Sequence, residues 1–412
     1  MAVSKVILNG TTLIDATTAT ASAADILSPK TAMLANGVMT TGTGTGGGGT
    51  TQKQVNFIDY DGTILYSYTA PEANALTALP ANPSHTGLTA QGWNWTLAQI
   101  KAQLTAMPDA PVWVGQMYIT ASGDTEIDVH FTDAARLSPI LTIAVNGTVT
   151  VNWGDGTTAD TVTGTSLTTR QAVPHTYSAV GDYTIKIHVT SGNFTFNGSN
   201  SYTLLRKNTS GNESRIYANC VQAVRFGTGV TSIGNYAFNT CYSLASVTIP
   251  GGVTSIGGTA FQYCSRLASI TIPSDVTSIG SSVFCSCSSL ASITIPSGVT
   301  SIGSSAFSSC SSLASITIPS GVTSIVGSAF SSCPSLASIT IPSGVTSIGN
   351  SAFSSCYGIK EYHVKPTSPP TLGTTAFANI SSDCVIYVPT AKLADYQAAE
   401  NWSAYASYMQ GE

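Results

Sequence analysis

Residues 290–312 read LASITIPSGVTSIGSSAFSSCSS, and close copies of this stretch recur at an interval of 23 residues between positions 230 and 357. Three apolar columns keep that interval through six copies: Val230, Val253, Val276, Val299, Val322 and Val345; Ile233, Ile256, Ile279, Ile302, Ile325 and Ile348; and Phe238, Phe261, Phe284, Phe307, Phe330 and Phe353. A typical copy holds one strand-forming Ile-Thr-Ile triplet before a proline, and then a return rich in turn-forming residues. Because a single copy is too short to bury its own apolar face, the copies are expected to stack as a mainly β solenoid.

The array follows the pattern Leu-xx-Ile-x-Ile-Pro-xx-Val-xx-Ile-xxx-Ala-Phe-xx-Cys in one register. In this pattern it resembles the BspA-like leucine-rich repeats over about residues 220–412. The resemblance implies a leucine-rich-repeat solenoid, a role in adhesion and host-surface recognition, and no catalytic residue. We place the repeats at 207–360 and a capping repeat at 361–412, with a helix from Ala391 to about Met409 that covers the last coil.

Residues 1–50 form a separate segment in the sequence. Val6 to Ile14 predict a short hairpin, because the Asn9-Gly10 pair suits a tight turn between strands. The stretch at 40–51, TTGTGTGGGGTT, has the composition of a flexible linker. An apolar patch ahead of a glycine tether indicates an attachment segment, with a frayed terminus as the alternative. Residues 1–45 look like the N-terminal segment of tail-associated proteins from phages and prophages of gut Firmicutes.

Residues 51–114 predict a small module of a β-hairpin and a helix. Asp61-Gly62 separates two alternating apolar runs, which is a strong hairpin signal. Thr96 is the expected N-cap of a helix that runs to Met107. The segment 52–98 also resembles the small Listeria–Bacteroides-type repeat modules that close with a Gly-Trp pair.

Residues 115–206 predict a β-sandwich made of several short strands. Asn146-Gly147 is the expected turn of one of its hairpins. VNWGDGT at 151–157 and HTYSAVGDYTIKI at 175–187 resemble a PKD-type sandwich. The expected fold is therefore a leucine-rich-repeat solenoid preceded by a PKD-like β-sandwich and small β modules.

Only 8% of the residues are charged, against about 25% in a typical soluble domain, and the net charge is −5. This balance argues against a nucleic-acid partner, which requires a face rich in Lys and Arg. The first residues lack the apolar run of a secretory signal, and no stretch reaches the length of a membrane span. We therefore expect synthesis in the cytoplasm and no membrane insertion.

One motif mimics an enzyme. Asp59-Tyr60-Asp61-Gly62-Thr63 matches the signature of haloacid-dehalogenase phosphatases, and Gly123-Asp124 with Asp128 imitates their magnesium motif. Such an enzyme needs several strand–helix units between the two motifs, whereas this chain offers one helix and two proline-rich loops there. The alternative is a hairpin with an Asp-Gly turn. The sequence also lacks a P-loop and a G-x-S-x-G elbow, so we predict that the protein is not an enzyme.

No cofactor or metal site is expected either. Trp153-Gly154-Asp155-Gly156 lacks the alternating acids of a calcium loop, so Asp155 is expected to cap backbone amides. Cys285 and Cys287 find no second pair to complete a zinc site. Six cysteines keep the 23-residue period and are expected to form a reduced, buried column, although the coil spacing does not forbid disulfides: Cys241, Cys264, Cys287, Cys310, Cys333 and Cys356.

The array itself is nearly free of charge, since only Arg266 and Asp275 are charged between Val230 and Tyr357. Departures from the consensus gather in the first two copies, and they are the candidate receptor-binding residues: Tyr236, Asn239, Tyr242, Gln262, Tyr263 and Arg266. Tyrosine and arginine are common interface anchors, and aromatic rings beside amides suit sugars. The alternative is that these residues are variation left in copies older than the homogenised ones.

Together these observations favour a non-enzymatic phage tail fibre or receptor-binding protein, located in the virion. Its expected partners are a bacterial surface glycan or protein receptor and, through the N-terminal segment, phage tail or baseplate proteins. Tail fibres are often trimers, so a homotrimer is possible, although no heptad coiled coil enforces one. The alternative is a bacterial cell-surface adhesin of the BspA-like class.

Overall fold

The computed structural model describes residues 5–8, 11–15, 32–33, 39–40, 54–107, 111–198, 204–207, 217 and 219–412. The chain divides into two units, 1–52 and 53–412. In the first unit β1 (Lys5–Leu8) pairs with β2 (Thr11–Asp15), and β3 (Ala32–Met33) pairs with β4 (Met39–Thr40), both antiparallel. The predicted hairpin is thus confirmed, while its Asn9-Gly10 turn and the glycine-rich stretch beyond Thr40 lie outside the described residues.

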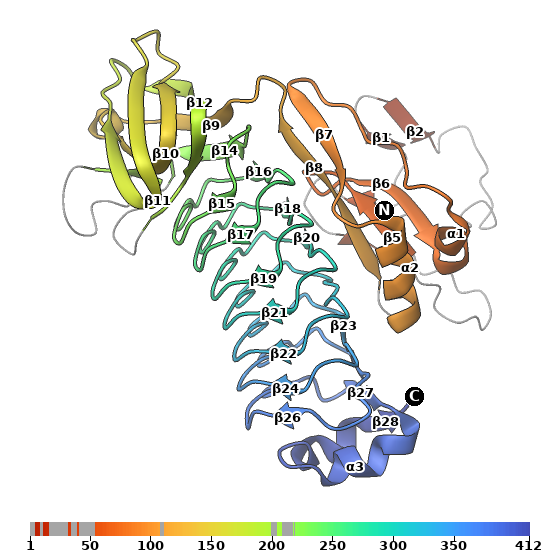
Figure 1. Ribbon diagram of the computed structural model, residues 1–412. Helices are drawn as coiled ribbons and strands as arrows, with labels where there is room; N and C mark the ends of the chain where they lie inside the picture. Colours follow the sequence, from red (N-terminus) through yellow and green to blue (C-terminus); the bar gives the residue numbers. More distant parts are fainter. Residues whose placement is uncertain are drawn as a thin grey trace. The chain divides into compact units, whose positions relative to one another are not determined.

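The second unit begins with a four-stranded sheet of order β6-β5-β8-β7 (Figure 1). Its elements are β5 (Gln54–Ile58), β6 (Ile64–Thr69), α1 (Ala70–Ala75), β7 (Leu88–Trp93), α2 (Leu97–Ala106) and β8 (Val112–Thr120). We call residues 54–120 the small module; the expected boundary at 114 lies inside β8. The Asp61-Gly62 hairpin is confirmed, with Gly62 at φ +88°. Thr96 caps α2 as predicted, in a capping box with Gln99.

The next strands form one seven-stranded sheet of order β11-β10-β12-β9-β14-β16, with β13 also paired to β10. They are β9 (Thr125–Phe131), β10 (Ile140–Asn152), β11 (Asp160–Pro174), β12 (Gly181–Thr195), β13 (Leu205–Arg206), β14 (Val221–Arg225) and β16 (Ser246–Thr248), with a 3₁₀ turn, η1 (Ala134–Arg136), after β9. The expected separate sandwich is therefore one hydrogen-bonded sheet. Because β14 pairs with β9 on one side and β16 on the other, this sheet runs on into the repeats.

The expected hairpin turn at Asn146-Gly147 is wrong, because both residues lie inside the continuous strand β10. Gly147 pairs with Gly164 on one side and Gly192 on the other. It has φ +124°, and a Cβ there would lie 2.2 Å from the carbonyl oxygen of Ser191. Glycine serves here for a close approach of two strands rather than for a turn.

Most coils of the array contain two short strands, not only the Ile-Thr-Ile strand expected from the sequence; in one coil the Ile316–Ile318 stretch is not a strand. One row comprises β16, β18 (Ser269–Thr271), β20 (Ser292–Thr294), β23 (Ser338–Ile341), β25 (Glu361–Val364), β27 (Val385–Val388) and β28 (Met409–Gly411). The other comprises β15 (Ser232–Ile233), β17 (Ser255–Ile256), β19 (Ser278–Ile279), β21 (Ser301–Ile302), β22 (Ser324–Ile325), β24 (Ser347–Ile348) and β26 (Thr371–Leu372). Neighbouring repeat strands pair in parallel, for instance Ile302 with Ile325, so the predicted mainly β solenoid of 23-residue coils is confirmed (Figure 1).

Two of the buried columns inside the coils are formed by the periodic phenylalanines and cysteines. The rings of Phe238, Phe261, Phe284, Phe307, Phe330, Phe353 and Phe377 stack in sequence, with centroids 5.2 to 5.7 Å apart. Beside them the periodic cysteines are buried free thiols, as predicted. Each thiol from Cys264 to Cys356 donates to the carbonyl of the phenylalanine in the preceding coil, as Cys310 Sγ does to Phe284 O at 3.2 Å. Burial raises the pKa of the Cys241 thiol to about 12, so the column stays protonated.

The C-terminal end is not the single helix expected from Ala391 to Met409. It contains η3 (Thr390–Lys392), α3 (Leu393–Ala398), η4 (Ser403–Tyr408) and then strand β28. Asn401 takes φ +61° between α3 and η4, and this turn sends Trp402 inward to donate from Nε1 to Pro370 O at 2.7 Å. The Trp402 and Tyr405 rings contact Phe377, so the segment covers the last coil as expected of a cap. Among the described helices, none is long and apolar enough to cross a membrane.

Candidate functional site

The candidate receptor-binding residues lie in the turns of the first two coils that hold the stacked phenylalanines. Tyr236 and Tyr263 have positive φ, 57° and 62°, at positions that serines occupy in most later coils. Their backbone amides donate to the next coil, Tyr236 N to Gly258 O at 3.1 Å and Tyr263 N to Cys285 O at 2.9 Å. Because this ladder fixes the backbone, the tyrosines project from rigid turns, which reduces the entropy lost when they contact a partner.

The six candidates differ in exposure. Tyr242 is 38% exposed and Tyr263 is 42% exposed, and Arg266 is also exposed. Asn239, by contrast, is only 4% exposed, and its amide donates to Gln262 Oε1 at 3.1 Å. Asn239 therefore orients Gln262 rather than facing a partner.

Further along the same turns, an open groove of about 570 Å³ runs across four coils. Its lining residues are Ser286, Ser288, Ser309, Ser311, Ser332, Pro334, Ser355 and Tyr357. At the 23-residue spacing, Tyr263 belongs to the column of Ser286 and Tyr242 to the column of Ser288. We call this continuous surface, from Tyr242 to Tyr357, the turn face.

Tyr357 was missed from the sequence. It is 57% exposed at the far end of the groove, where it follows the periodic Cys356 directly. Tyr242 follows the periodic Cys241 in the same way, in a place where most copies have serine or proline. This departure from the consensus, which Tyr357 shares with Tyr242, is the sequence signal that could have identified Tyr357. The turn face thus offers tyrosines at both ends and serine hydroxyls between them.

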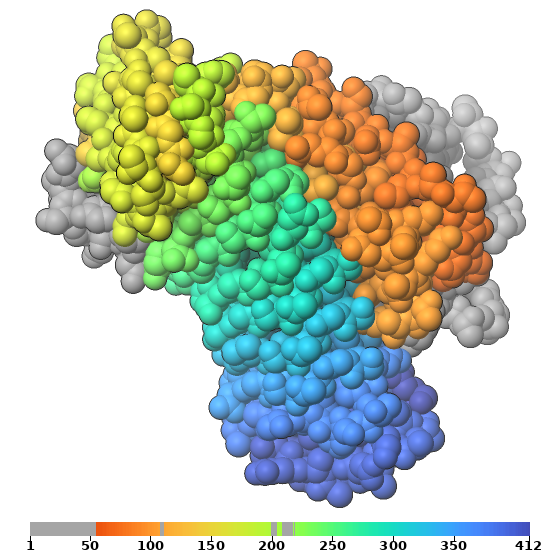
Figure 2. Space-filling view, viewed as in Figure 1, coloured from red at the N-terminus to blue at the C-terminus, as the bar shows by residue number. Residues whose placement is uncertain are grey.

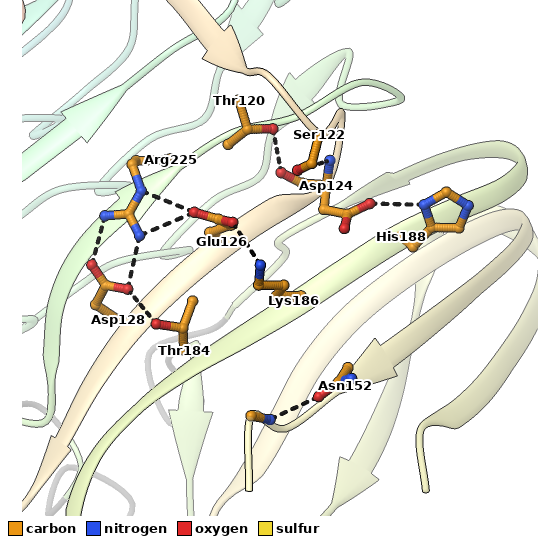
Figure 3. Close-up of polar contacts among 11 residues, drawn as sticks. Thr120, Ser122, Asp124, Glu126, Asp128, Asn152, Thr184, Lys186, His188 and Arg225 are labelled. Atoms are coloured by element: carbon orange, nitrogen blue, oxygen red, sulfur yellow. Dashed lines mark hydrogen bonds and ion pairs between the residues drawn. The ribbon is translucent and has the colours of Figure 1, made fainter. Parts of the chain in front are cut away.

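A second polar surface lies on the sheet that precedes the array (Figure 3). Arg225 of β14 donates to both oxygens of Asp128 at 2.6 and 2.8 Å, and to Glu126 at 3.1 Å. Burial alone would raise the pKa of Asp128, but the Arg225 guanidinium lowers it overall. Lys186 pairs with Glu126 at 3.1 Å, beside an open hollow of about 600 Å³ that Asp128 and Asp182 help to line. The Arg225 pairs join β14 to β9, and the Lys186 pair joins β12 to β9, so together they tie the start of the array to the sheet.

The phosphatase-like residues take part in separate contacts. Asp59 is 3% exposed; its Oδ1 accepts from Tyr118 Oη at 2.8 Å, and its Oδ2 lies 2.6 Å from His85 Nε2. Asp124 lies 2.7 Å from His188, and Asp128 pairs with Arg225 (Figure 3). Both carboxylate oxygens of Asp59 are thus engaged, one by Tyr118 and the other by His85. The lack of enzymatic activity stays a prediction.

Asp155 caps backbone as expected, because its Oδ1 accepts from Thr157 N at 3.1 Å. Its Oδ2 lies 2.8 Å from His175 Nε2. Burial would raise the pKa of Asp155, but the hydrogen bonds from Thr157 and His175 lower it overall. Within the described part of the chain, no group of three or more His, Cys, Asp or Glu side chains is arranged to hold a metal ion.

Comparison with known proteins concerns the repeats. Residues 189–313 and 277–396 match the family model described as BspA type leucine-rich repeat region, in six copies. Among solved structures, the chain is similar to a leucine-rich repeat protein from Bacteroides ovatus ATCC 8483, with 30% identity over 43% of this chain and 52% of that one, and a TM-score of 0.35. It is also similar to the leucine-rich repeat protein of T. pallidum, with 34% identity over 35% of this chain and 67% of that one, and a TM-score of 0.33.

A further similar structure is a leucine-rich cell surface protein from Faecalibacterium prausnitzii A2-165, with 26% identity over 48% of this chain and 65% of that one, and a TM-score of 0.31. The chain spans about half the length of the Bacteroides ovatus protein. Proteins with curated descriptions yielded no match.

Proposed function

Because this chain belongs to the family of BspA-type leucine-rich repeat proteins, we propose that it is a non-enzymatic recognition protein whose repeat array adheres to a receptor on a bacterial surface. The observation that carries the proposal is the turn face. It displays Tyr242, Tyr263 and Tyr357 as exposed large side chains, on an array whose surface is otherwise mostly Ser and Thr. Tyrosine supplies apolar contact area and a hydroxyl, and serine hydroxyls both donate and accept hydrogen bonds.

The nearly uncharged array favours a receptor that is recognised through rings and hydroxyl groups, such as a surface glycan or an uncharged protein patch. Contacts of this kind are weakly screened by salt, unlike contacts between charged surfaces. We therefore expect binding to bacterial cells that changes less than about twofold between 50 and 500 mM NaCl.

The test is binding of the fluorescently labelled protein to cells and to purified envelope glycans. The triple variant Tyr242→Ala, Tyr263→Ala, Arg266→Ala should bind several-fold more weakly while its melting stays nearly unchanged. Val180→Ser is the matched control, since Val180 is 51% exposed in the bend just before β12, away from the turn face. Equal binding by the triple variant and the wild type would remove the receptor role from this end of the turn face.

We also propose the setting in which recognition occurs: a phage tail or phage-derived tail, with residues 1–45 as the attachment segment. The support is the resemblance of that segment to tail-associated proteins and the glycine-rich stretch that follows it. Deleting residues 1–45 should spare cell binding and prevent incorporation into particles. A homotrimer would sediment at three times the chain mass. Immunogold labelling of the cell envelope in cultures without particles would favour the BspA-like surface adhesin instead.

A further inference from the structure

The Ile-Thr-Ile strands of the array form a continuous surface, which we call the strand face. A column of threonines marks it, one to a coil: Thr248, Thr271, Thr294, Thr317 and Thr340. A threonine that points outward from an uncovered sheet is normally exposed to solvent, yet these threonines are between 0 and 6% exposed. Something in the chain therefore covers the strand face.

The cover is the small module, whose side chains are hydrogen-bonded to the backbone of the array. Trp95 Nε1 donates to Ile295 O at 2.9 Å, and Asn94 Nδ2 donates to Ile272 O at 3.0 Å. Gln103 makes two contacts, from Nε2 to Ile318 O at 3.3 Å and from Ser320 N to its Oε1 at 3.2 Å. Three successive coils are therefore held by three side chains of one short segment.

The two surfaces also fit closely. A Cβ at Gly115 of β8 would lie 2.4 Å from Thr271 Oγ1 and 2.5 Å from Thr294 Oγ1, so the β8 backbone lies directly on the threonine column. Figure 2 shows residues 54–120, in orange, lying against the green and cyan coils. Only glycine leaves room for this approach.

These contacts are of a permanent kind. Asn94 and Gln103 are 1 and 2% exposed, and their amides find partners in the array backbone. If the module separated from the array, these amides would lose their hydrogen-bond partners and would have to be hydrated again. Separation would also expose the apolar surface around Trp95, which is part of the core of the small module. A lid that opens for a ligand is instead drawn from weakly packed, solvent-exposed segments.

We infer that the small module is a fixed cover of the strand face from Thr248 to Thr317, so that this face is closed to receptors and recognition is left to other surfaces of the array. The claim that recognition is left to other surfaces rests on the proposed function, whereas the fixed cover does not. Solenoids commonly use such extended surfaces for their partners. In this chain the partner of that surface is built into the same polypeptide.

Thiol labelling tests the cover without any receptor. Thr271→Cys is made in a Cys285→Ser background, because Cys285 is the one cysteine that is not fully buried. Thr271 Oγ1 has no hydrogen-bond partner among the described residues, so the change removes none. The thiol at position 271 should react only as fast as the whole chain unfolds, at least a hundredfold more slowly than at the exposed control Ser312→Cys. Fast labelling under native conditions would overturn the inference.

Hydrogen exchange on the wild-type chain covers the case in which that variant misfolds. Peptides containing residues 269–272 and 292–295 should keep the protection of the array core. If they exchange as fast as exposed turns while the phenylalanine turns stay protected, the module opens and the cover is not fixed.

Gly115→Ala tests the consequence for recognition. The added methyl group collides with two threonine hydroxyls and should loosen the module. Adding Thr271→Ala and Thr294→Ala should restore most of the fit, because the only hydrogen bond to the module that it removes, among those of the described residues, is the one from Asn94 Nδ2 to Thr294 Oγ1. Loosening should leave cell binding within about twofold of wild type, whereas a several-fold gain that the restored variant loses would show a receptor site beneath the module. If the wild type binds no cells or glycans, the proposed function fails, and the labelling experiment still decides the cover.

Discussion

Removing one ring from the phenylalanine stack should destabilise the array locally and strongly. Phe307 is fully buried, and its ring stacks on Phe284 at 5.6 Å and on Phe330 at 5.3 Å. Phe→Ala in a buried core typically costs about 3–5 kcal/mol. Because the neighbouring coils are held in place by hydrogen bonds on both sides, they cannot close over the cavity. We expect a loss of about 4–5 kcal/mol for Phe307→Ala.

Urea unfolding followed by circular dichroism gives the size of this loss, and hydrogen exchange gives its location. Apart from the small module on the strand face, each coil contacts only its neighbours, so lost protection should centre on the coils of Phe284, Phe307 and Phe330. Peptides around Phe377 should be much less affected. Ser312→Ala, an exposed change in the same coil, is the control and should stay within about 0.5 kcal/mol of wild type.

Two outcomes would refute this reasoning about Phe307. A loss below about 1 kcal/mol would mean that the ring is not enclosed as the structure has it. An equal loss of protection in every coil would mean that the array unfolds as one cooperative unit, and the nearest-neighbour picture would be wrong.

Two further predictions concern the thiols and pH. A thiol-reactive dye should label Cys285 in the native protein and the column from Cys241 to Cys356 only after denaturation; fast native labelling of the column would contradict its burial. His363 lies 2.9 Å from Glu412; burial lowers its pKa, but the Glu412 contact outweighs burial and raises it overall. That stabilisation is complete below the unfolded pKa of about 6.5 and lost as pH rises through the higher folded pKa. His363→Gln should thus cost about 1 kcal/mol at pH 5.5 and little at pH 9, measured by urea unfolding at both pH values.

The array was predictable from the sequence because its information is periodic. Each copy repeats the same burial pattern, so six copies confirm one register and the inward positions of Phe307 and Cys310 follow directly. The second strand of each coil, such as the two-residue β21, is too short to show the alternation of apolar and polar residues that predicts a strand. The turn predicted at Asn146-Gly147 was wrong for a different reason. The dipeptide suits a turn, but Gly147 is needed where two strands approach closely.

The cover of the strand face could not be predicted from the sequence. Asn94 and Gln103 lie 178 and 215 residues from the carbonyls they contact, Ile272 and Ile318. An isolated asparagine or glutamine carries no local sign of such a distant partner, because its amide would be equally stable in water. Tyr357 could have been predicted as a surface residue of the turn face, since it breaks the serine pattern in the same way as Tyr242.

The joint between β14 and β9 has a consequence for how the array can vary in length. Middle copies are nearly interchangeable, and the module contacts backbone carbonyls that every coil repeats, so these contacts cannot tell one coil from the next. The pairing of Arg225 with Asp128 fixes the N-terminal end of the array, and the cap at Trp402 fixes its C-terminal end. A recombination event that inserts or deletes 23 residues beyond Ser320 would therefore leave both ends and the module contacts intact. Copy number, and with it the reach of the turn face, is free to change in whole coils.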